Sequence, residues 1–192
     1  MIVVEGPDGA GKSTLCSMLG KALGLPILHA GGPPETVKDV EDRIAQVLLD
    51  PMVIRDRCVL VSELVYGPIR GRALLEEARA VDLLKNHPGL IVVYCRPGLR
   101  YLLEHLEKNL GQNKSYKPME HRNSVLQKYI QIVSEYDALM TVLEEAGVVV
   151  LKYAWPPADT KTGLLPGNYS RCPSCDQSPL DCLCKEVKPC AD

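Results

Sequence analysis

The feature that most constrains this chain is a glycine-rich run close to its amino end, set between a strand pattern and a helix pattern. Residues 2–5, IVVE, form a short apolar run typical of a buried strand. Gly6 is followed by four residues and then by Gly11, Lys12 and Ser13, after which apolar residues recur at helical spacing. A strand, a glycine loop and a helix in this order predict a backbone that wraps around phosphate.

The residue types in this run suit a triphosphate and its metal ion. Glycines let backbone N–H groups approach phosphate oxygens closely, and the start of a helix adds positive potential. Lys12 would neutralise the terminal phosphates, and Ser13 would ligate Mg²⁺. We therefore expect ATP and Mg²⁺ as cofactors, although the run alone does not separate a kinase from an ATPase or a GTPase. The expected nucleotide-binding residues are Gly6, Pro7, Asp8, Gly9, Ala10, Gly11, Lys12, Ser13 and Thr14.

Apolar strand patterns and helix patterns alternate along most of the chain. Strands are expected at 2–5, 25–30, 52–56, 90–95 and 148–153. Helices are expected at 15–23, from Thr36 towards Pro51, and at 73–87, 99–110 and 121–146. Strands that alternate with helices predict an α/β fold with a doubly wound, parallel, five-stranded sheet and right-handed crossovers. The polar segment at 111–120, GQNKSYKPME, is expected to be a mobile lid.

The composition excludes several classes of protein. With 192 residues and 46% hydrophobic content, the chain can form one buried domain and a small appendage. Its net charge of -2 gives no global attraction to nucleic acid or to an anionic membrane. No apolar run approaches the roughly 20 residues of a membrane span, and the amino end lacks the features of a signal peptide. We therefore expect a soluble, cytoplasmic protein without a membrane partner, in the host cytoplasm if the chain is viral.

The cysteines divide into a scattered group and a group near the carboxyl end. Cys16, Cys58 and Cys95 stand in apolar surroundings and are expected in the core. Residues 156–171, rich in Pro, Gly and small polar residues, predict a linker to a tail at 172–192. Because clustered cysteines in a reducing compartment favour metal over disulfides, the tail predicts a small zinc-knuckle-like site; the alternative is a flexible tail with redox-prone thiols. The expected Zn²⁺ ligands are Cys172, Cys175, Cys182 and Cys184, with Cys190 in reserve.

A second polar run, RDRCVLVSELVYGPIRGR, follows the third expected strand. It places acidic, basic, hydroxyl and aromatic side chains near the carboxyl ends of strands, where doubly wound sheets bind ligands. Together with the glycine run GPDGAGKST, it resembles the thymidylate kinase family of P-loop nucleotide kinases, and especially compact members encoded by bacteriophages. The resemblance spans roughly residues 1–155, and it implies a P-loop fold of the nucleoside monophosphate kinase type for that domain.

The resemblance implies a role for the polar residues of the second run. Asp56 would join the Mg²⁺ and phosphate network, and Arg57 would bind the acceptor phosphate or the transferring phosphoryl group. Ser62, one residue further from Arg57 than in the family, would line a thymine pocket with Tyr66. The expected phosphate clamps are Arg43, Arg57, Arg70 and Arg72. The expected lid cations, which would stabilise the transferring group, are Lys114 and Lys117, with Arg100, Lys108 and Arg122 as alternatives.

Two thymidine-like acceptors fit this resemblance. The first is dTMP, whose phosphate needs no general base because a phosphomonoester has a second pKa of roughly 6. The second is the hydroxymethyl group of 5-hydroxymethyluracil within phage DNA, an alcohol whose proton Asp56 or Glu63 would accept. Only 43 residues separate Lys12 from Asp56, and Arg43 is the one arginine in the expected helix between them. A single arginine makes a reduced clamp for the phosphate of a free nucleotide. Together with the cysteine tail, this favours the DNA acceptor slightly.

A third hypothesis, from another class of protein, is a non-catalytic ATP-dependent switch or a zinc-mediated interaction protein. The expected lid and the complete set of Lys12, Ser13, Asp56 and Arg57 argue against it. Oligomeric state leaves no local signature in a sequence, so a homodimer stays open.

Overall fold

Five parallel strands form one sheet, in the order β2-β3-β1-β4-β5. The computed structural model describes residues 1–99, 101–103 and 119–154, and the side chains among them except those of 119–124. The strands are β1 (Ile2–Glu5), β2 (Ile27–His29), β3 (Ile54–Asp56), β4 (Ile91–Cys95) and β5 (Val149–Tyr153). Their apolar, largely β-branched residues suit a sheet that is covered on both faces. The predicted α/β class and the parallel five-stranded sheet are confirmed.

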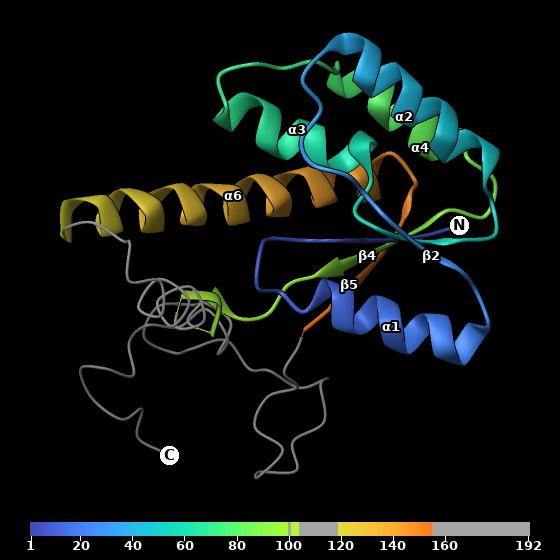
Figure 1. Cartoon of the computed structure of the whole chain (residues 1–192), viewed down its shortest axis with the longest axis horizontal. Coiled ribbons are helices and arrows are strands. Elements are labelled where there is room, and N and C mark those ends of the chain that lie inside the picture. The colour runs from blue at the N-terminus through green and yellow to red at the C-terminus, as the bar shows by residue number, and fades with distance from the viewer. Residues whose placement is uncertain (100, 104–118, 155–192) are drawn as a thin grey trace, which may run out of the picture.

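The helices lie in two layers, one on each side of the sheet (Figure 1). They are α1 (Lys12–Leu23), α2 (Val37–Leu49), α3 (Val59–Ile69), α4 (Glu77–Asn86) and α6 (Met119–Glu145). In Figure 1, α2, α3, α4 and α6 lie above the sheet and α1 lies below it. Because β1 pairs with β3 on one side and β4 on the other, the strand order reverses at β1, and the loop after β1 opens at this switch point.

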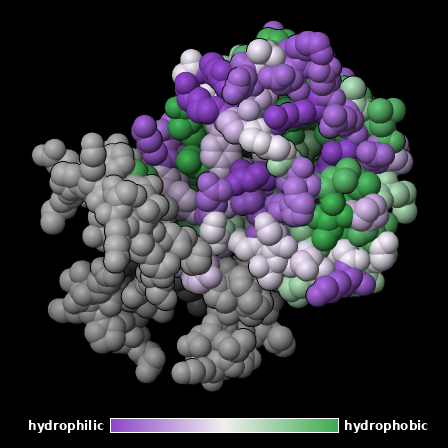
Figure 2. Space-filling view, in the orientation of Figure 1, coloured by the Kyte–Doolittle hydropathy of each residue, from purple (hydrophilic) through white to green (hydrophobic). Residues whose placement is uncertain are grey.

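Strand alternation divides the core between the two faces of the sheet. Val3 of β1 belongs to a core with α2, α3, α4 and α6, whereas Val4 belongs to a core with α1 and with Tyr129 and Val133 of α6. The three scattered cysteines are buried as predicted, with Cys58 in the first of these cores and Cys16 and Cys95 in the second. The outer side of the upper layer is polar, and hydrophilic residues gather over α2 and α4 in Figure 2. The two cores hold the sheet rigid beneath the loops that follow its strands.

Local sequence explains the ends of α1 and α2. Thr36 and Asp39 form a reciprocal cap, in which Asp39 N–H donates to Thr36 Oγ1 and Thr36 N–H donates to Asp39 Oδ2. At the carboxyl end of α1, Gly24 adopts a left-handed conformation with φ 67°, which glycine accepts without steric cost. Both boundaries agree with those predicted from the sequence.

Helix α3 was not expected from the sequence. Its segment, VLVSELVYGPI, is apolar around most of its circumference and rich in valine, and Gly67 and Pro68 lie in its last turn. A distant residue supports its start, because Cys58 N–H donates to Glu5 Oε1 over 2.6 Å. A carboxylate at a helix amino end is favourable, and this one arrives only through folding.

Several predicted boundaries need correction. Helix α4 begins at Glu77 rather than at residue 73, and β2 is limited to Ile27–His29. Helix α6 begins at Met119, so the last two residues of the expected lid at 111–120 are helical. The rest of that lid lies outside the described residues, as do the expected linker at 156–171 and tail at 172–192. No helix in the described part of the chain combines the length and apolar character that crossing a membrane requires.

Candidate active site

The glycine run forms a loop that its glycines make possible. Gly6 has φ 142°, and a Cβ there would lie 2.4 Å from the carbonyl oxygen of Cys95 at the end of β4. Gly11 has φ 81° and is the residue from which α1 begins. Because only glycine combines this backbone with the close approach to β4, the loop after β1 is fixed by local sequence and by one neighbouring strand.

Lys12 lies over this loop and is almost fully buried, with 7% of its surface exposed. Its Nζ donates to the carbonyl oxygen of Pro7 over 2.7 Å. Burial lowers the pKa of this ammonium, and the positive charge of Arg57 lowers it further. The charged side chain is therefore held, at a cost, in the first turn of α1 and against the glycine loop.

Ser13 and Asp56 form the hydrogen bond that joins α1 to β3. Ser13 Oγ donates to Asp56 Oδ2 over 2.7 Å, and His29 Nδ1 lies 3.2 Å from the same oxygen. His29 and Asp56 are register partners on adjacent strands, which places both side chains on the α1 face of the sheet. A serine hydroxyl and a carboxylate are hard oxygen ligands, so this pair fits Mg²⁺, which takes few protein ligands and completes its shell with water and phosphate.

Arg57 connects three parts of the site. Among the described residues it is the one non-glycine with a positive φ, 75°, a conformation that costs roughly 1–2 kcal/mol. Its guanidinium pairs with the Asp8 carboxylate, lies 5.2 Å from the centre of the Tyr66 ring, and has Nη1 3.5 Å from Tyr136 Oη. The surrounding contacts hold the strained residue between the glycine loop, α3 and α6.

Glu5 is a site residue that the sequence analysis missed. It is fully buried at the end of β1, and it accepts hydrogen bonds from Cys58 N–H, Ser62 Oγ and Tyr136 Oη over 2.6, 3.0 and 3.0 Å. Burial raises the pKa of this carboxyl, although the bond from Cys58 N–H opposes the rise. The signal in the sequence is a charged residue at the end of an apolar strand. Glu5 fixes the start of α3, and thereby the positions of the residues that follow Arg57.

Two cavities open on either side of Arg57. The phosphate-loop cavity has a volume of about 500 Å³ and is lined by Asp8, Gly9, Gly11, Lys12, Ser13, Thr14, His29, Ala30, Asp56, Arg57 and Tyr101. The second cavity, about 520 Å³, lies between the β2–α2 loop, α2, β3 and α3. We call it the arginine-lined cavity, after Arg43, Arg55, Arg57 and Arg70 in its wall. Both cavities include Asp8, His29, Ala30 and Arg57, so they meet at Arg57.

Arg55 corrects the expectation of a reduced clamp. Alternation along β3 turns its side chain to the α2 face, opposite to Asp56, and 9% of its surface is exposed. Its Nη2 donates to the carbonyl oxygen of Gln46 over 2.6 Å, whereas its buried Nε has no hydrogen-bond partner in the described part of the chain. The sequence analysis counted arginines in the helix and missed one on the strand, so the cavity is richer in cations than expected.

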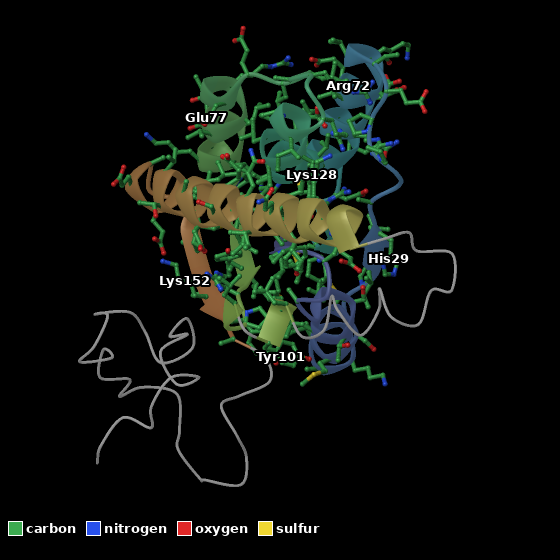
Figure 3. All side chains as sticks on the ribbon, turned by 90° about the vertical axis from the view of Figure 1, so that its left-hand side faces the viewer. His29, Arg72, Glu77, Tyr101, Lys128 and Lys152 are labelled. Carbon is green, nitrogen blue, oxygen red and sulfur yellow. The ribbon has the colours of Figure 1, made fainter. Side chains whose placement is uncertain are left out.

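Two other expected clamps hold a loop. Arg43 Nη1 donates to the carbonyl oxygen of Gly32 over 2.6 Å, while the residue also lines the arginine-lined cavity. Arg72 lies outside the lining of both cavities and donates to the carbonyl oxygens of Pro34 and Glu35. Figure 3 shows Arg72 beside α2, well away from His29, which lies at the level of α1. In this structure Arg72 therefore fixes the β2–α2 loop.

Helix α3 brings the other expected substrate residues to the arginine-lined cavity. Ser62, Glu63, Tyr66 and Arg70 all line it. Glu63 has a side chain that is 1% exposed, and its Oε2 accepts from Arg70 Nη2 over 2.6 Å. Its Oε1 and the hydroxyl of Tyr66 are buried without a hydrogen-bond partner among the residues described. Sequence reasoning named these residues but placed them on no helix.

The remaining predicted site residues lie outside the described part of the chain. They are the expected lid cations Lys114, Lys117, Arg100 and Lys108, the side chain of Arg122, and the four expected zinc ligands Cys172, Cys175, Cys182 and Cys184. Within the residues described, no group of three or more histidine, cysteine or acidic side chains is arranged to hold a metal ion.

Comparison with known proteins identifies the fold. No family model matches the chain, and no curated protein matches it by sequence. A solved structure of the YorR protein from Bacillus subtilis, in complex with phosphorylated GDP, matches with a TM-score of 0.59 and 22% identity, over 80% of this chain and 84% of that one. Deoxyadenosine kinase from M. mycoides with bound dATP matches with a TM-score of 0.51 and 16% identity, over 84% and 93%. Shikimate kinase from Acinetobacter baumannii in complex with shikimate matches with a TM-score of 0.50 and 16% identity, over 79% and 82%.

The chain therefore has the fold of P-loop kinases. The matches cover 79% to 84% of this chain, and at these identities the likeness concerns the fold. The narrower resemblance to thymidylate kinases and their phage members is carried by the sequence runs alone and stays a prediction.

Proposed function

We propose that this chain is an ATP-dependent kinase that transfers the γ-phosphoryl group to a nucleotide acceptor. The observation that carries the proposal is the meeting of the two cavities at Arg57, with Lys12 and the Ser13–Asp56 pair on one side and arginines on the other. A transfer reaction needs donor and acceptor phosphates at adjoining sites with cations between them, and this is the arrangement that the two cavities provide.

Each residue near the junction has a defined task in such a transfer. The glycine loop and Lys12 would bind the terminal phosphates of ATP, and Ser13 and Asp56 would hold Mg²⁺. The ion, when bound, neutralises charge on the transferring group. Arg57 would orient the phosphoryl group between the two cavities, since its strained backbone and its contacts with Asp8 and Tyr66 fix its position. Lys114 and Lys117 would add lid cations.

The arginine-lined cavity favours an acceptor that carries phosphate. Arg43, Arg55, Arg57 and Arg70 line it, together with the carboxylates of Asp8, Asp39, Asp42 and Glu63. Asp8 and Glu63 pair with Arg57 and Arg70, and guanidinium groups bind phosphate through paired N–H donors. Arg55 lines the cavity while its Nη2 is held by the carbonyl oxygen of Gln46 and lies 3.7 Å from Asp50 Oδ2, so its charge is fixed where it can attract such an acceptor. Ser62 and Tyr66 would line the base pocket of a thymidine-like nucleotide, as the sequence resemblance implies.

The first candidate acceptor is dTMP. Its phosphate is ionised near neutral pH, so no general base is needed. The acidic residues at the junction are already engaged, Asp8 with Arg57 and Asp56 with Ser13 and His29. An acceptor that makes no demand for a free carboxylate agrees with these pairings.

The second candidate is the hydroxymethyl group of 5-hydroxymethyluracil in DNA. Glu63 favours it, because this residue lines the arginine-lined cavity beside Arg70 and is a carboxylate of the type that accepts the proton of an alcohol. A base in duplex DNA would first have to leave the stack, which costs a few kcal/mol, and the arginines could then hold the flanking phosphates.

Transfer of a label distinguishes these candidates. We would incubate the protein with Mg²⁺ and γ-labelled ATP, offering a panel of deoxynucleoside monophosphates and, separately, duplex DNA with or without 5-hydroxymethyluracil. Label on dTMP supports the first acceptor, and label only on the modified DNA supports the second. Lys12→Ala should abolish either transfer while the fold is retained. A folded protein that labels neither acceptor would contradict the proposal and favour a non-catalytic ATP switch.

The cysteine tail is a separate proposal. We propose that Cys172, Cys175, Cys182 and Cys184 bind one structural Zn²⁺, because two close cysteine pairs can complete a tetrahedral thiolate site. Elemental analysis of the purified full chain should return about one zinc per chain, and replacement of Cys172 and Cys175 by serine should remove it. A metal-free full chain purified without chelator would reject the site.

A further inference from the structure

Two buried tyrosines of α6, Tyr129 and Tyr136, bond to the active site although no described residue of α6 lines either cavity. They lie seven positions apart, which is close to two helical turns. Both side chains therefore leave α6 on the same side, about 10 Å apart along its axis. Tyr129 belongs to the core with Val4, whereas Tyr136 belongs to the core with Val3.

Tyr129 holds the glycine loop from outside the phosphate-loop cavity. Its hydroxyl donates to the carbonyl oxygen of Asp8. A trans peptide is planar with its C=O and N–H on opposite sides, so a bond that fixes the Asp8 carbonyl also fixes the direction of the Gly9 N–H. Gly9 lines the phosphate-loop cavity, and backbone N–H groups of such a loop are its phosphate ligands. The hydroxyl of Tyr129 therefore acts on the loop that would bind ATP.

Tyr136 holds Arg57, the residue at which the two cavities meet. Its hydroxyl donates to Glu5 Oε2 over 3.0 Å, and Arg57 Nη1 lies 3.5 Å from the same hydroxyl. Glu5 also accepts from the N–H of Cys58, the residue that follows Arg57. The Tyr136 ring is itself fixed, because it stacks on Tyr94 with the ring centres 5.9 Å apart. Arg57, whose φ is 75°, is thus held from its backbone side and from its guanidinium side.

We propose that Tyr129 and Tyr136 are positioning residues of the transfer: Tyr129 sets the glycine loop for the phosphates of ATP, and Tyr136 sets Arg57 for the transferring group. The inference rests on the proposed function and extends it to a helix behind the site. Burial raises the pKa of both phenols above the ordinary value of 10, so both hydroxyls keep the proton that they donate near neutral pH.

Replacement by phenylalanine tests each hydroxyl while the ring and its packing remain. Tyr129→Phe should weaken the binding of Mg²⁺ and ATP by roughly three- to tenfold, as for the loss of one hydrogen bond. Tyr136→Phe should lower kcat by roughly tenfold, because Arg57 acts on the transferring group. Its affinity for ATP should stay within about twofold of the wild type. The two variants therefore change different constants, a separation that a common loss of stability does not produce.

Tyr94→Phe is the matched control. Tyr94 is fully buried and stacks on Tyr136, but its hydroxyl donates to Asp137 Oδ1 over 2.6 Å. The variant removes the same chemical group from the same aromatic cluster. It should lose stability while kcat and the affinity for ATP stay unchanged. The measurements are urea unfolding, calorimetry with Mg²⁺ and an ATP analogue that cannot transfer its terminal phosphate, and steady-state transfer of label.

Two results would overturn the inference. In the first, all three variants lose stability with both constants unchanged, and α6 only packs against the sheet. In the second, all three change kcat and the affinity for ATP alike. If Tyr136→Phe fails to fold because Glu5 loses its donor, the variant is combined with Glu5→Gln, since an unpaired amide costs less than an unpaired carboxylate. Its kcat is then compared with that of Glu5→Gln alone, and equal values would reject the role of Tyr136.

Failure of the inference and failure of the proposed function give different results. A wild type that transfers phosphate while Tyr129→Phe and Tyr136→Phe behave as Tyr94→Phe would refute the inference alone. A wild type that binds the ATP analogue but transfers no phosphate would refute the proposed function. Binding does not depend on transfer, so the affinities of Tyr129→Phe and Tyr94→Phe for the analogue would still decide whether α6 positions the glycine loop.

Discussion

Ser13, in the first turn of α1, donates a 2.7 Å hydrogen bond to Asp56, at the end of β3, across 43 positions of the chain. The bond links the glycine loop to the neighbouring strand. It also brings a hydroxyl and a carboxylate to within the distance at which both can bind one divalent cation. The Mg²⁺ requirement of the proposed reaction is therefore expected to depend on both residues together.

Ser13→Ala and Asp56→Asn should each raise the Mg²⁺ concentration for half-maximal activity, by about 10- to 100-fold. The loss should be greater for Asp56→Asn, because the carboxylate charge is removed. The double variant should lose less than the sum of the two effects, since both act on one ion. A Mg²⁺ titration of activity measures this, and Ser17→Ala on the same helix is the control. Independent, additive losses would contradict a shared ion.

Gly6→Ala should disrupt the glycine loop. The new Cβ would lie 2.4 Å from the backbone oxygen of Cys95, and φ 142° is unfavourable for alanine, so we expect a loss of more than 2 kcal/mol in unfolding free energy or a displaced loop that no longer binds ATP. Denaturant unfolding and ATP binding measure the two effects. At Gly32 a Cβ meets no neighbour within 4 Å, so Gly32→Ala should change stability by no more than about 0.5 kcal/mol.

Arg55→Lys should weaken acceptor binding. Lysine keeps the positive charge but loses the planar guanidinium whose Nη2 donates to the carbonyl oxygen of Gln46. We expect the KM for the acceptor to rise roughly tenfold, with the KM for ATP unchanged, as for the loss of one charge-assisted hydrogen bond. Arg79→Lys, in an exposed pair with Glu41, is the matched control. If the variant loses stability while the KM for the acceptor stays unchanged, Arg55 only caps the carboxyl end of α2.

Glu5→Gln should change how stability depends on pH. Burial raises the pKa of Glu5, so above its ordinary value of 4.5 the folded chain retains a proton that the unfolded chain has released. The contribution of Glu5 to stability is therefore present at low pH and is lost as pH rises through the raised pKa. The variant lacks this titration and should gain stability relative to the wild type as pH rises. Urea unfolding from pH 5 to pH 8 measures the difference, and a constant difference would contradict the raised pKa.

The glycine loop could be predicted from the sequence because its causes are local. Gly6, Gly11, Lys12 and Ser13 lie within eight positions, and the strand before them and the helix after them follow from short apolar patterns. The same is true of the cap at Thr36 and of the parallel sheet, which alternating strands and helices imply. These features needed no knowledge of distant contacts.

The arginine-lined cavity could not be predicted in the same way. Arg55 lies in the strand expected at 52–56 and was given no role, and only the pairing of β3 shows which face its side chain takes. Helix α3 has an apolar pattern without a clear helical period, and its start is supported by Glu5, 53 positions away. The environment of the Glu63 carboxylate is set by Arg70 and Gly67, which lie beside it only because the segment is helical.

The sequence by itself determined the phosphate loop, because backbone conformation at three glycines and the start of one helix are set by neighbouring residues. The tertiary structure alone decided which arginines line the second cavity, because that cavity is assembled from the glycine loop, the β2–α2 loop, α2, β3 and α3, which meet only when the sheet forms. Side-chain direction across such an assembly depends on packing and strand register, and neither is written in any short stretch of the chain.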